Sequence, residues 1–283
     1  MVNTANISHE HQHIIRVWTF QDALLESYRY APGPAEELPK HFHDEYQIGV
    51  SINFPGEYTY RGARHPVPVG SLNVIHPGEM HSARDTEYRH VYADFRKVYV
   101  APERVRTVAH ELTGRKAGLP FFPEPIIFDT DLATLFLDFH ATKEEANPLL
   151  ERETLFTSFL ARLIVRHADE RHRLMPFKGE RDGVRRSREY LRDNYAENVS
   201  LGRLAQIAGL SRFHFLRAFH REVGLPPHKY QTQVRVERAK LLIAGGASIQ
   251  EVAQAVGFVD QSHLNRHFRR LSQVTPGRYI PAK

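Results

Sequence analysis

The 283-residue chain contains no cysteine. Disulfide frameworks, thiolate zinc fingers, iron–sulfur clusters and cysteine nucleophiles are therefore excluded, and His, Asp and Glu are the only side chains left to bind a metal. The absence of cysteine also fits a reducing compartment. No apolar run approaches the ~18 residues of a membrane-spanning helix, and the N-terminus lacks the basic and apolar regions of a secretory signal. We therefore expect a soluble, cytoplasmic protein with no membrane partner.

The net charge of +5 is distributed unevenly along the chain. Residues 1–175 hold 19 basic and 24 acidic side chains, a net charge of −5, whereas residues 176–283 hold 19 and 9, a net charge of +10. The cut lies before a polar stretch with Pro and Gly, residues 176–183, which predicts a linker. A basic segment beside an acidic one is typical of a nucleic-acid binder with a second function, and a solvated basic surface is the alternative.

An internal repeat occupies the basic segment. Leu204, Ala205, Gln206 and Gly209 recur 48 residues later as Val252, Ala253, Gln254 and Gly257, and after one inserted residue six more positions recur at an offset of 49. Ser200 and Ser211 stand where helix N-caps are expected, and Gly209 where a helix ends. The pattern predicts two helix-turn-helix units within residues 184–283.

A helix beginning at Pro227 is predicted between the two units. About 17 residues at 1.5 Å each span roughly 25 Å, so two recognition helices can enter successive major grooves about 34 Å apart with some bending of the DNA. Tyr230, Val234, Leu241 and Leu242 are expected to pack inward. Lys229, Arg235, Arg238, Arg269 and Arg270 are expected to contact phosphates or solvent.

The outward positions of the two recognition helices are the candidates for DNA contact. Arg suits guanine edges and Gln or Asn suits adenine, and a phosphate contact is the alternative for each residue. The predicted DNA-binding residues are Arg212, Phe213, His214, Arg217, Gln261, Ser262, His263, Asn265 and Arg266.

The segments SLGRLAQIAGLSRFHFLRAFHREVG and GFVDQSHLNRHFRRLSQVTPGRYI resemble the AraC/XylS family of bacterial transcription regulators. The resemblance covers about 100 C-terminal residues and implies a seven-helix domain that binds double-stranded promoter or operator DNA. It also implies a homodimer, and a contact with RNA polymerase if the protein is an activator. Leu216 departs from the long polar residue that family members often carry at that position of the first recognition helix.

The first hundred residues alternate apolar and polar side chains between Pro and Gly turns, which predicts a β-sandwich or small barrel. In HFHDEYQ, His41 and His43 lie on one side of an extended segment that Glu45 and Gln47 continue. HPGEMH supplies His76, Glu79 and His81. The two segments resemble the motifs of the cupin barrel, the usual sensing domain of this family.

Three uses of this cluster remain open. The first is a divalent cation such as zinc, iron or nickel held by His41, His43, Glu45 and His81, although Glu45 lies closer to His43 than metal-binding cupins place their carboxylate and Gln47 stands at the expected position. The second is a small-molecule effector, and the third is a structural role. The candidate effector-binding residues are His41, His43, Gln47, Tyr58, Tyr60, His81 and Tyr92.

The sequence thus predicts two domains. Residues 1–175 form one domain, an all-β cupin or jelly-roll barrel (about 10–100) with added helices (about 101–175), and this domain is expected to bind the effector and to dimerise. Residues 176–183 are a linker. Residues 184–283 form an all-α domain with two helix-turn-helix units. The predicted function is effector-controlled, sequence-specific DNA binding in transcription, without catalysis. The alternatives are a metal-dependent cupin enzyme or metal sensor fused to a DNA-binding domain, and an architectural DNA binder.

Overall fold

The computed structural model describes residues 13–114, 118–142, 148–169, 180–272 and 274–279. The chain divides into two compact units. The first consists of Met1–Arg106, Leu119–Leu137 and His167–Asp169, and the second of Thr107–Gly118, Asp138–Arg166 and Glu170–Lys283.

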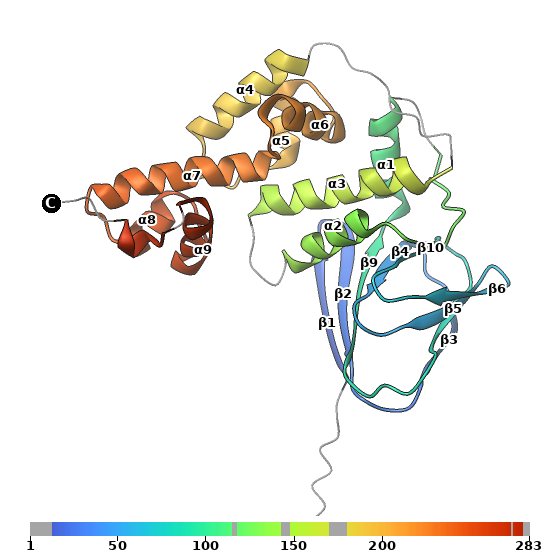
Figure 1. The fold of residues 1–283 in the computed structure, drawn as a ribbon. Coiled ribbons are helices and arrows are strands. Elements are labelled where there is room, and N and C mark those ends of the chain that lie inside the picture. Colours follow the sequence, from blue (N-terminus) through green and yellow to red (C-terminus); the bar gives the residue numbers. More distant parts are fainter. Residues whose placement is uncertain (1–12, 115–117, 143–147, 170–179, 273, 280–283) are drawn as a thin grey trace, which may run out of the picture. The chain divides into compact units, whose positions relative to one another are not determined.

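Strands of the first unit form two antiparallel sheets (Figure 1). Within the described residues, one sheet has the order β1-β2-β9-β4-β7-β10 and the other the order β3-β8-β5-β6. The strands are β1 Ile14–Phe20, β2 Ala23–Tyr30, β3 Glu37–His41, β4 Tyr46–Ser51, β5 Gly56–Tyr60, β6 Ala63–Val67, β7 Leu72–Ile75, β8 His81–Asp85, β9 Ala93–Val100 and β10 Ile126–Ile127. This arrangement confirms the predicted all-β N-terminal domain.

Strand β4 shows how the alternating pattern builds the interior of this unit. It lies between β9 and β7, and all six of its residues are buried. Tyr46, Ile48 and Val50 form its apolar face, so the polar face with Gln47 and Gly49 is also enclosed rather than exposed to water. A sheet whose polar row points inward supplies polar groups to a cavity.

A tight turn connects β5 to β6. Arg61 and Gly62 both have positive φ, 51° and 77°, as a two-residue hairpin turn requires. The turn places β5 and β6 in antiparallel register, with Tyr60 opposite Ala63.

Three helices follow the barrel strands in sequence: α1 Pro102–Thr113, α2 Thr130–Ala141 and α3 Leu149–His167. Each contributes residues to both units. Four apolar side chains of α3, Phe159, Leu160, Leu163 and Ile164, are at most 1% exposed. The dimerisation expected of the domain that contains these helices stays a prediction.

The second unit contains both predicted helix-turn-helix pairs. Its remaining helices are α4 Glu180–Asp193, α5 Leu201–Ala208, α6 Arg212–Val223, α7 Pro227–Ala244, α8 Ile249–Ala255 and α9 Gln261–Ser272, followed by the short 3₁₀ turn Pro276–Arg278. Figure 1 shows α7 running between the pair α5–α6 and the pair α8–α9. The predicted all-α domain with two helix-turn-helix units is therefore confirmed.

The caps explain why each pair breaks where it does. The hydroxyl of Ser200 accepts a hydrogen bond from the Arg203 N–H, and the hydroxyl of Ser211 accepts one from the His214 N–H. Gly209 ends α5 in the left-handed region at φ 70°, and Gly257 occupies the equivalent place after α8 at φ 84°. A Cβ on Gly257 would stand 2.2 Å from the Ala196 carbonyl oxygen, so this turn also needs a close backbone approach.

Polar side chains of α7 join the two halves of the second unit. Arg235 donates to the carbonyls of Tyr195 (2.7 Å) and Glu197 (2.9 Å), and Gln231 donates to the same two carbonyls at 3.1 and 3.0 Å. Arg235 is 3% exposed, and burial lowers its pKa to about 10. The expectation that Arg235 contacts phosphate or solvent is wrong, because this residue holds the loop between α4 and α5.

Other expectations for this region also need correction. Leu241 and Leu242 are 65% and 38% exposed, because the polar residues Gln231 and Arg235 occupy the buried side of α7 instead. Residues 180–183 of the expected linker form the start of α4, where Gly183 packs against the backbone of Ala208; residues 176–179 lie outside the described residues. The single domain boundary at residue 175 stays a prediction.

Candidate functional site

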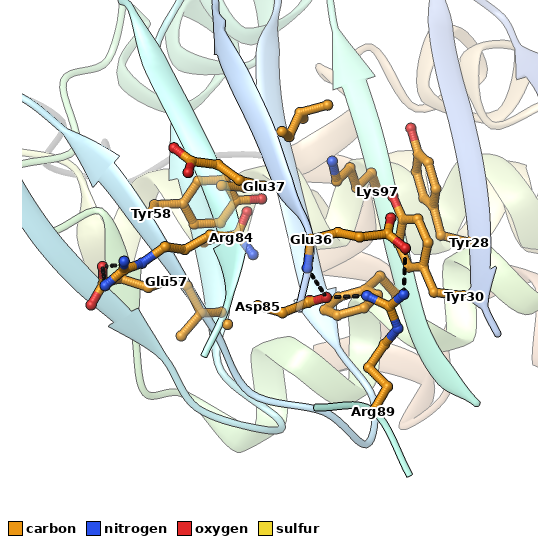
Figure 2. Close-up of a pocket in the computed structure, with 16 residues that line it drawn as sticks. Tyr28, Tyr30, Glu36, Glu37, Glu57, Tyr58, Arg84, Asp85, Arg89 and Lys97 are labelled. Carbon is orange, nitrogen blue, oxygen red and sulfur yellow. Dashed lines mark hydrogen bonds and ion pairs between the residues drawn. The ribbon is translucent and has the colours of Figure 1, made fainter. Parts of the chain in front are cut away.

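A cavity of about 190 Å³ lies among the strands of the first unit (Figure 2). Its wall contains aromatic rings from Tyr28, Tyr30, Tyr58 and Phe95, and its polar groups include the ammonium of Lys97. The cavity is lined by Tyr28, Tyr30, Glu36, Glu37, Leu38, Gly56, Glu57, Tyr58, Val67, Asn73, Ala83, Arg84, Asp85, Arg89, Phe95 and Lys97. Aromatic faces with a few polar groups are the usual composition of a small-molecule site.

Three adjacent strands build one side of this cavity. Lys97 of β9, Gly49 of β4 and Asn73 of β7 are register neighbours, so their Cα–Cβ directions share one face of the sheet. A Cβ on Gly49 would stand 3.0 Å from Asn73 Oδ1 and 3.1 Å from its Nδ2. The missing side chain at Gly49 therefore makes room for the Asn73 amide to lie across β4.

Most of the charged groups around the cavity neutralise one another. Arg89 is 1% exposed and pairs with Asp85 and with Glu36, whose Oε1 lies 2.6 Å from its Nη2. Arg84 pairs with Glu57 at 2.8 Å. Figure 2 shows these two groups on different sides of the cavity, with Lys97 near Tyr28.

The environment of Lys97 is different. Its Nζ lies 4.9 Å from the centre of the Tyr28 ring, and among the described residues it has no ion-pair partner within 4.0 Å. Burial lowers the pKa of Lys97, while the charge of Glu26 on the neighbouring strand acts in the opposite direction. The Glu26 carboxylate itself accepts a hydrogen bond from the Tyr28 hydroxyl.

The predicted effector residues divide into those near the cavity and those away from it. Tyr58 lines the cavity, and its hydroxyl accepts a hydrogen bond from Gln47 Nε2 at 3.2 Å. Tyr60 instead bonds Glu79 and the His76 N–H, and Tyr92 is 36% exposed on a loop beneath Arg29. Neither Tyr60 nor Tyr92 lines the cavity.

The three predicted histidines do come together beside Tyr58. The ring of His81 lies 4.2 Å from that of His41 and 5.0 Å from that of His43, measured between ring centres, and 6.3 Å from that of Tyr58. Each Nδ1 bonds a backbone carbonyl, and the Nε2 atoms of His43 and His81 are buried with no hydrogen-bond partner within the described ranges. Burial lowers the pKa of His81 to about 4 and also lowers the pKa of His43, so these two imidazoles are neutral near pH 7.

The metal alternative does not fit these residues. Within the described part of the chain, no group of three or more His, Cys, Asp or Glu side chains is placed to hold a metal ion. The carboxylate expected from Glu45 is absent from the cluster's contacts, because Glu45 turns its backbone carbonyl toward His43 Nδ1 at 2.8 Å. The set His41, His43, Glu45 and His81 is therefore not supported as a zinc, iron or nickel site.

Sequence reasoning missed most of the cavity lining. Lys97, Asn73, Tyr28 and Tyr30 were not among the candidates, although all four lie within the first hundred residues, where strands were predicted. The available signal was a lysine at the inward position of β9, ADFRKVYV, between Phe95 and Tyr99. A charged residue in the inward row of a strand indicates a polar interior.

The two helix-turn-helix units present equivalent outward residues on α6 and α9. Arg217 and Arg266 occupy the same repeat position, and Arg217 is partly exposed while Arg266 is exposed. Gln261 and Ser262 are also exposed, whereas Arg212, Phe213 and Asn265 are partly exposed. These seven of the nine predicted DNA-contact residues have surface that a ligand can reach.

His214 and His263 do not face outward as expected, because each is only 4% exposed. The Nδ1 of His214 lies 2.9 Å from the Ser211 hydroxyl, and the ring of His263 packs on Phe258 with 5.3 Å between centres. The two histidines occupy equivalent repeat positions, and each packs near the start of its recognition helix. The expectation that they face outward to contact DNA is therefore wrong, because both side chains are buried.

The two recognition helices differ at one further repeat position. Leu216 of α6 is 8% exposed, whereas its counterpart Asn265 of α9 is partly exposed with an Oδ1 that has no partner among the described residues. An apolar side chain offers no hydrogen bond to a base edge, and an amide offers both a donor and an acceptor. The two units therefore present chemically different surfaces.

Helix α3 contacts the first helix-turn-helix unit. Leu150 is fully buried in the same apolar core as Leu201 and Phe215. The Glu153 carboxylate accepts a hydrogen bond from the N–H of Leu201 at 2.5 Å, at the positive end of α5. A shift of α3 would therefore disturb α5 directly.

No helix in the described part of the chain combines the length and the hydropathy that a membrane span requires.

Two family descriptions match this chain. A helix-turn-helix domain matches residues 204–281, and an AraC-like ligand binding domain matches residues 24–160. The first match covers both predicted reading units. The second covers the strands from β2 onward, the cavity and the start of α3.

The similar proteins that follow include HTH-type transcriptional regulators. The chain is 31% identical over 240 residues to the uncharacterised HTH-type transcriptional regulator YbfI of Bacillus subtilis, covering 85% of this chain and 86% of that protein. It is 24% identical over 260 residues to the HTH-type transcriptional activator RhaS of Pectobacterium carotovorum, covering 86% and 88%. Among solved structures it is similar to fatty acid-bound ToxT of Vibrio cholerae, with 12% identity, coverage of 91% and 94%, and a TM-score of 0.40.

Proposed function

Because this chain belongs to the AraC family of transcriptional regulators, we propose that α6 and α9 bind specific DNA sequences and that a small molecule bound in the barrel cavity controls their affinity for DNA. A member of this family is a DNA-binding regulator with a ligand-binding domain. The observation that carries the proposal is the tandem repeat, which presents Arg217 and Arg266 at equivalent outward positions.

DNA contact is assigned to the outward residues of both recognition helices. Arg217 and Arg266 have the guanidinium fork that pairs with guanine or with a phosphate, and Gln261 and Asn265 have amides that suit adenine. Because Leu216 offers no hydrogen bond, base recognition by α6 depends on its arginines and on apolar contacts. The two units are therefore expected to recognise unequal half-sites, and α9 is expected to be the more sequence-specific of the two.

Selection of DNA sites from a random pool tests this assignment. Arg217→Ala is expected to relax the bases selected in one half of the site and Arg266→Ala those in the other, each with a loss of about 10- to 100-fold in affinity. Arg185→Ala is the matched control, because Arg185 lies on α4 and pairs with Glu189 at 3.2 Å. An equal loss on every sequence, with a salt slope smaller by about 1, would instead assign the arginine to a phosphate. Equal binding of the wild type to all DNA would refute sequence-specific regulation.

Effector binding is assigned to the cavity between the two sheets of the first unit. Tyr58 and the neighbouring Gln47 are the predicted residues that support this site, and Lys97 and Asn73 extend it. An effector can act on DNA affinity only by binding two arrangements of the protein unequally. We place the connection at α3, because its first turn packs on the first helix-turn-helix unit and Glu153 bonds the start of α5.

The same proposal includes a homodimer that works in the cytoplasm without catalysis and contacts RNA polymerase if it activates transcription. Two copies on one operator would raise affinity through effective concentration. Light scattering of the purified protein tests the dimer, and a monomer at all concentrations, with and without operator DNA, would contradict it.

A further inference from the structure

Among the described residues that line the cavity, Lys97 is a cation with no ion-pair partner within 4.0 Å. Arg84 and Arg89 both have carboxylate partners, and Lys97 has none within 4.0 Å among the described residues. Lys97 lines the cavity and packs beside the Tyr28 ring. Burying an ammonium without a partner is costly, and this cost lowers the pKa of Lys97. An anion placed in the cavity would remove part of that cost.

The carboxylates around the cavity do not reverse this preference. Asp85 and Glu36 are bound by Arg89, and Glu57 is bound by Arg84. Glu37 is exposed, and Glu26 accepts the Tyr28 hydroxyl. A cationic ligand would therefore have to compete with arginines for Asp85, Glu36 and Glu57. An anionic ligand meets Lys97, which has no ion pair within 4.0 Å among the described residues.

A second polar group lies two strands away from Lys97. Asn73 is 4% exposed, its Oδ1 is buried with no hydrogen-bond partner in the described part of the chain, and its amide lies across Gly49 toward β9. Neighbouring strands are about 4.8 Å apart, so Lys97 and Asn73 start from backbones separated by roughly 10 Å. A buried amide oxygen without a donor favours a ligand that supplies a hydroxyl or amino hydrogen.

The size of the cavity restricts the ligand further. At about 30 Å³ for each molecule of liquid water, 190 Å³ is the volume of about six waters. The walls are aromatic: the Tyr28 and Tyr30 rings stack with 5.7 Å between their centres, and the Phe95 ring meets Tyr30 edge-on at an interplanar angle of 71°. Such walls suit the carbon skeleton of a small metabolite, with polar groups at its two ends.

We propose that the effector is a small hydroxylated carboxylate, whose anionic group pairs with Lys97 and whose hydroxyl groups bond the Asn73 amide. This inference rests on the proposed function, because it takes the cavity to be the effector site. It adds the chemical class of the ligand, which neither the family descriptions nor the relatives supply.

The test uses matched compounds of about four to six carbons on the full-length protein. Threonate and gluconate carry a carboxylate and hydroxyls, erythritol and glucitol carry hydroxyls alone, and butyrate and hexanoate carry a carboxylate alone. Thermal shift and isothermal calorimetry are expected to show at least one hydroxy acid binding ~10-fold or more tightly than its two partners.

Substitutions then assign the contacts. Lys97→Met is expected to lower the affinity for the hydroxy acid by ~10-fold or more and to change the affinity for the polyol by less than ~3-fold, since only the charge pair is lost. Asn73→Ala is expected to lower the affinities for the hydroxy acid and the polyol alike. Lys40→Met, at an exposed site on β3, is the matched control and is expected to change neither. Lys97→Gln repeats the measurement if the methionine variant does not fold.

The outcomes separate the two claims. A polyol that binds as tightly as the hydroxy acid, and depends on Asn73 but not on Lys97, would leave the cavity as the effector site and overturn the chemical class. A hydroxy acid that binds equally to wild type, Lys97→Met and Asn73→Ala would place the ligand elsewhere and overturn both. Absence of binding by every hydroxy acid in the series would overturn the class.

Discussion

The paired contacts of Arg235 and Gln231 predict a strongly non-additive double mutant. Each of the two carbonyls, on Tyr195 and Glu197, accepts one hydrogen bond from Arg235 and one from Gln231, at distances from 2.7 to 3.1 Å. If one of the two side chains is replaced, each carbonyl still accepts a hydrogen bond from the remaining side chain. If both are replaced, two carbonyls lie beside the buried face of α7 with no donor from that helix.

The expected magnitudes follow from that difference. Arg235→Met removes two charge-assisted bonds but also a buried charge, so we expect a loss of about 1–2 kcal/mol in the free energy of unfolding, and about 1 kcal/mol for Gln231→Leu. The double variant should lose about 2 kcal/mol more than the sum, because each orphaned carbonyl costs about 1–3 kcal/mol.

Urea denaturation followed by far-UV circular dichroism measures this cycle in the helical unit. Arg238→Met is the matched control, since Arg238 is exposed and its guanidinium lies 5.5 Å from the centre of the Tyr195 ring. Additive losses would refute the shared-acceptor reasoning. A DNA-binding salt slope that falls by about 0.9 in Arg235→Met, at unchanged stability, would show a phosphate contact instead.

Two further predictions concern stability. Gly209→Ala should lower the free energy of unfolding by about 1–2 kcal/mol, because Gly209 has a φ of 70°. Gly257→Ala should lower it by ~2 kcal/mol more, because its Cβ would also stand 2.2 Å from the Ala196 oxygen. Equal losses of melting temperature in the two variants would contradict the close approach at Gly257. Burial lowers the pKa of His76 from 6.5 to about 4, and its Nε2 accepts the Phe122 N–H at 3.0 Å, so the native state binds fewer protons than the unfolded state below pH 6.5. The stability that this group contributes should therefore be fully present above pH 6.5, fall by up to about 1.4 kcal/mol per pH unit from there to about pH 4, and fall no further below that. A melting temperature that follows pH with the same slope in His76→Gln as in the wild type would contradict this.

Local rules predicted the helical unit well. The N-caps Ser200 and Ser211, the left-handed Gly209 and the helix start at Pro227 all lie where short-range chemistry places them. Long-range packing was harder to predict. His214, His263 and Arg235 are polar residues on helices that a pattern assigns to the surface, and they are buried because partners distant in sequence or in the turn satisfy them.

In the barrel, the sequence predicted most strands and the gathering of His41, His43 and His81. It did not predict that the cavity would lie beside Lys97 and Asn73, because that depends on which strands become neighbours. Lys97, Gly49 and Asn73 are 24 to 48 residues apart in the chain and meet only through the pairing of β9, β4 and β7. Helix α1 and strands β3 and β8 were also missed, since each is short or carries a mixed pattern.

The central claim is that occupancy of the cavity controls DNA binding. Its most direct test is the affinity for a selected DNA site, measured by fluorescence anisotropy with and without a saturating ligand, in the wild type and in Lys97→Met. The account predicts that the ligand changes the wild-type dissociation constant by about 5-fold or more and leaves that of the variant unchanged at the same ligand concentration. A ligand that fills the cavity, as calorimetry reports, while the wild-type affinity for DNA stays the same would contradict the account.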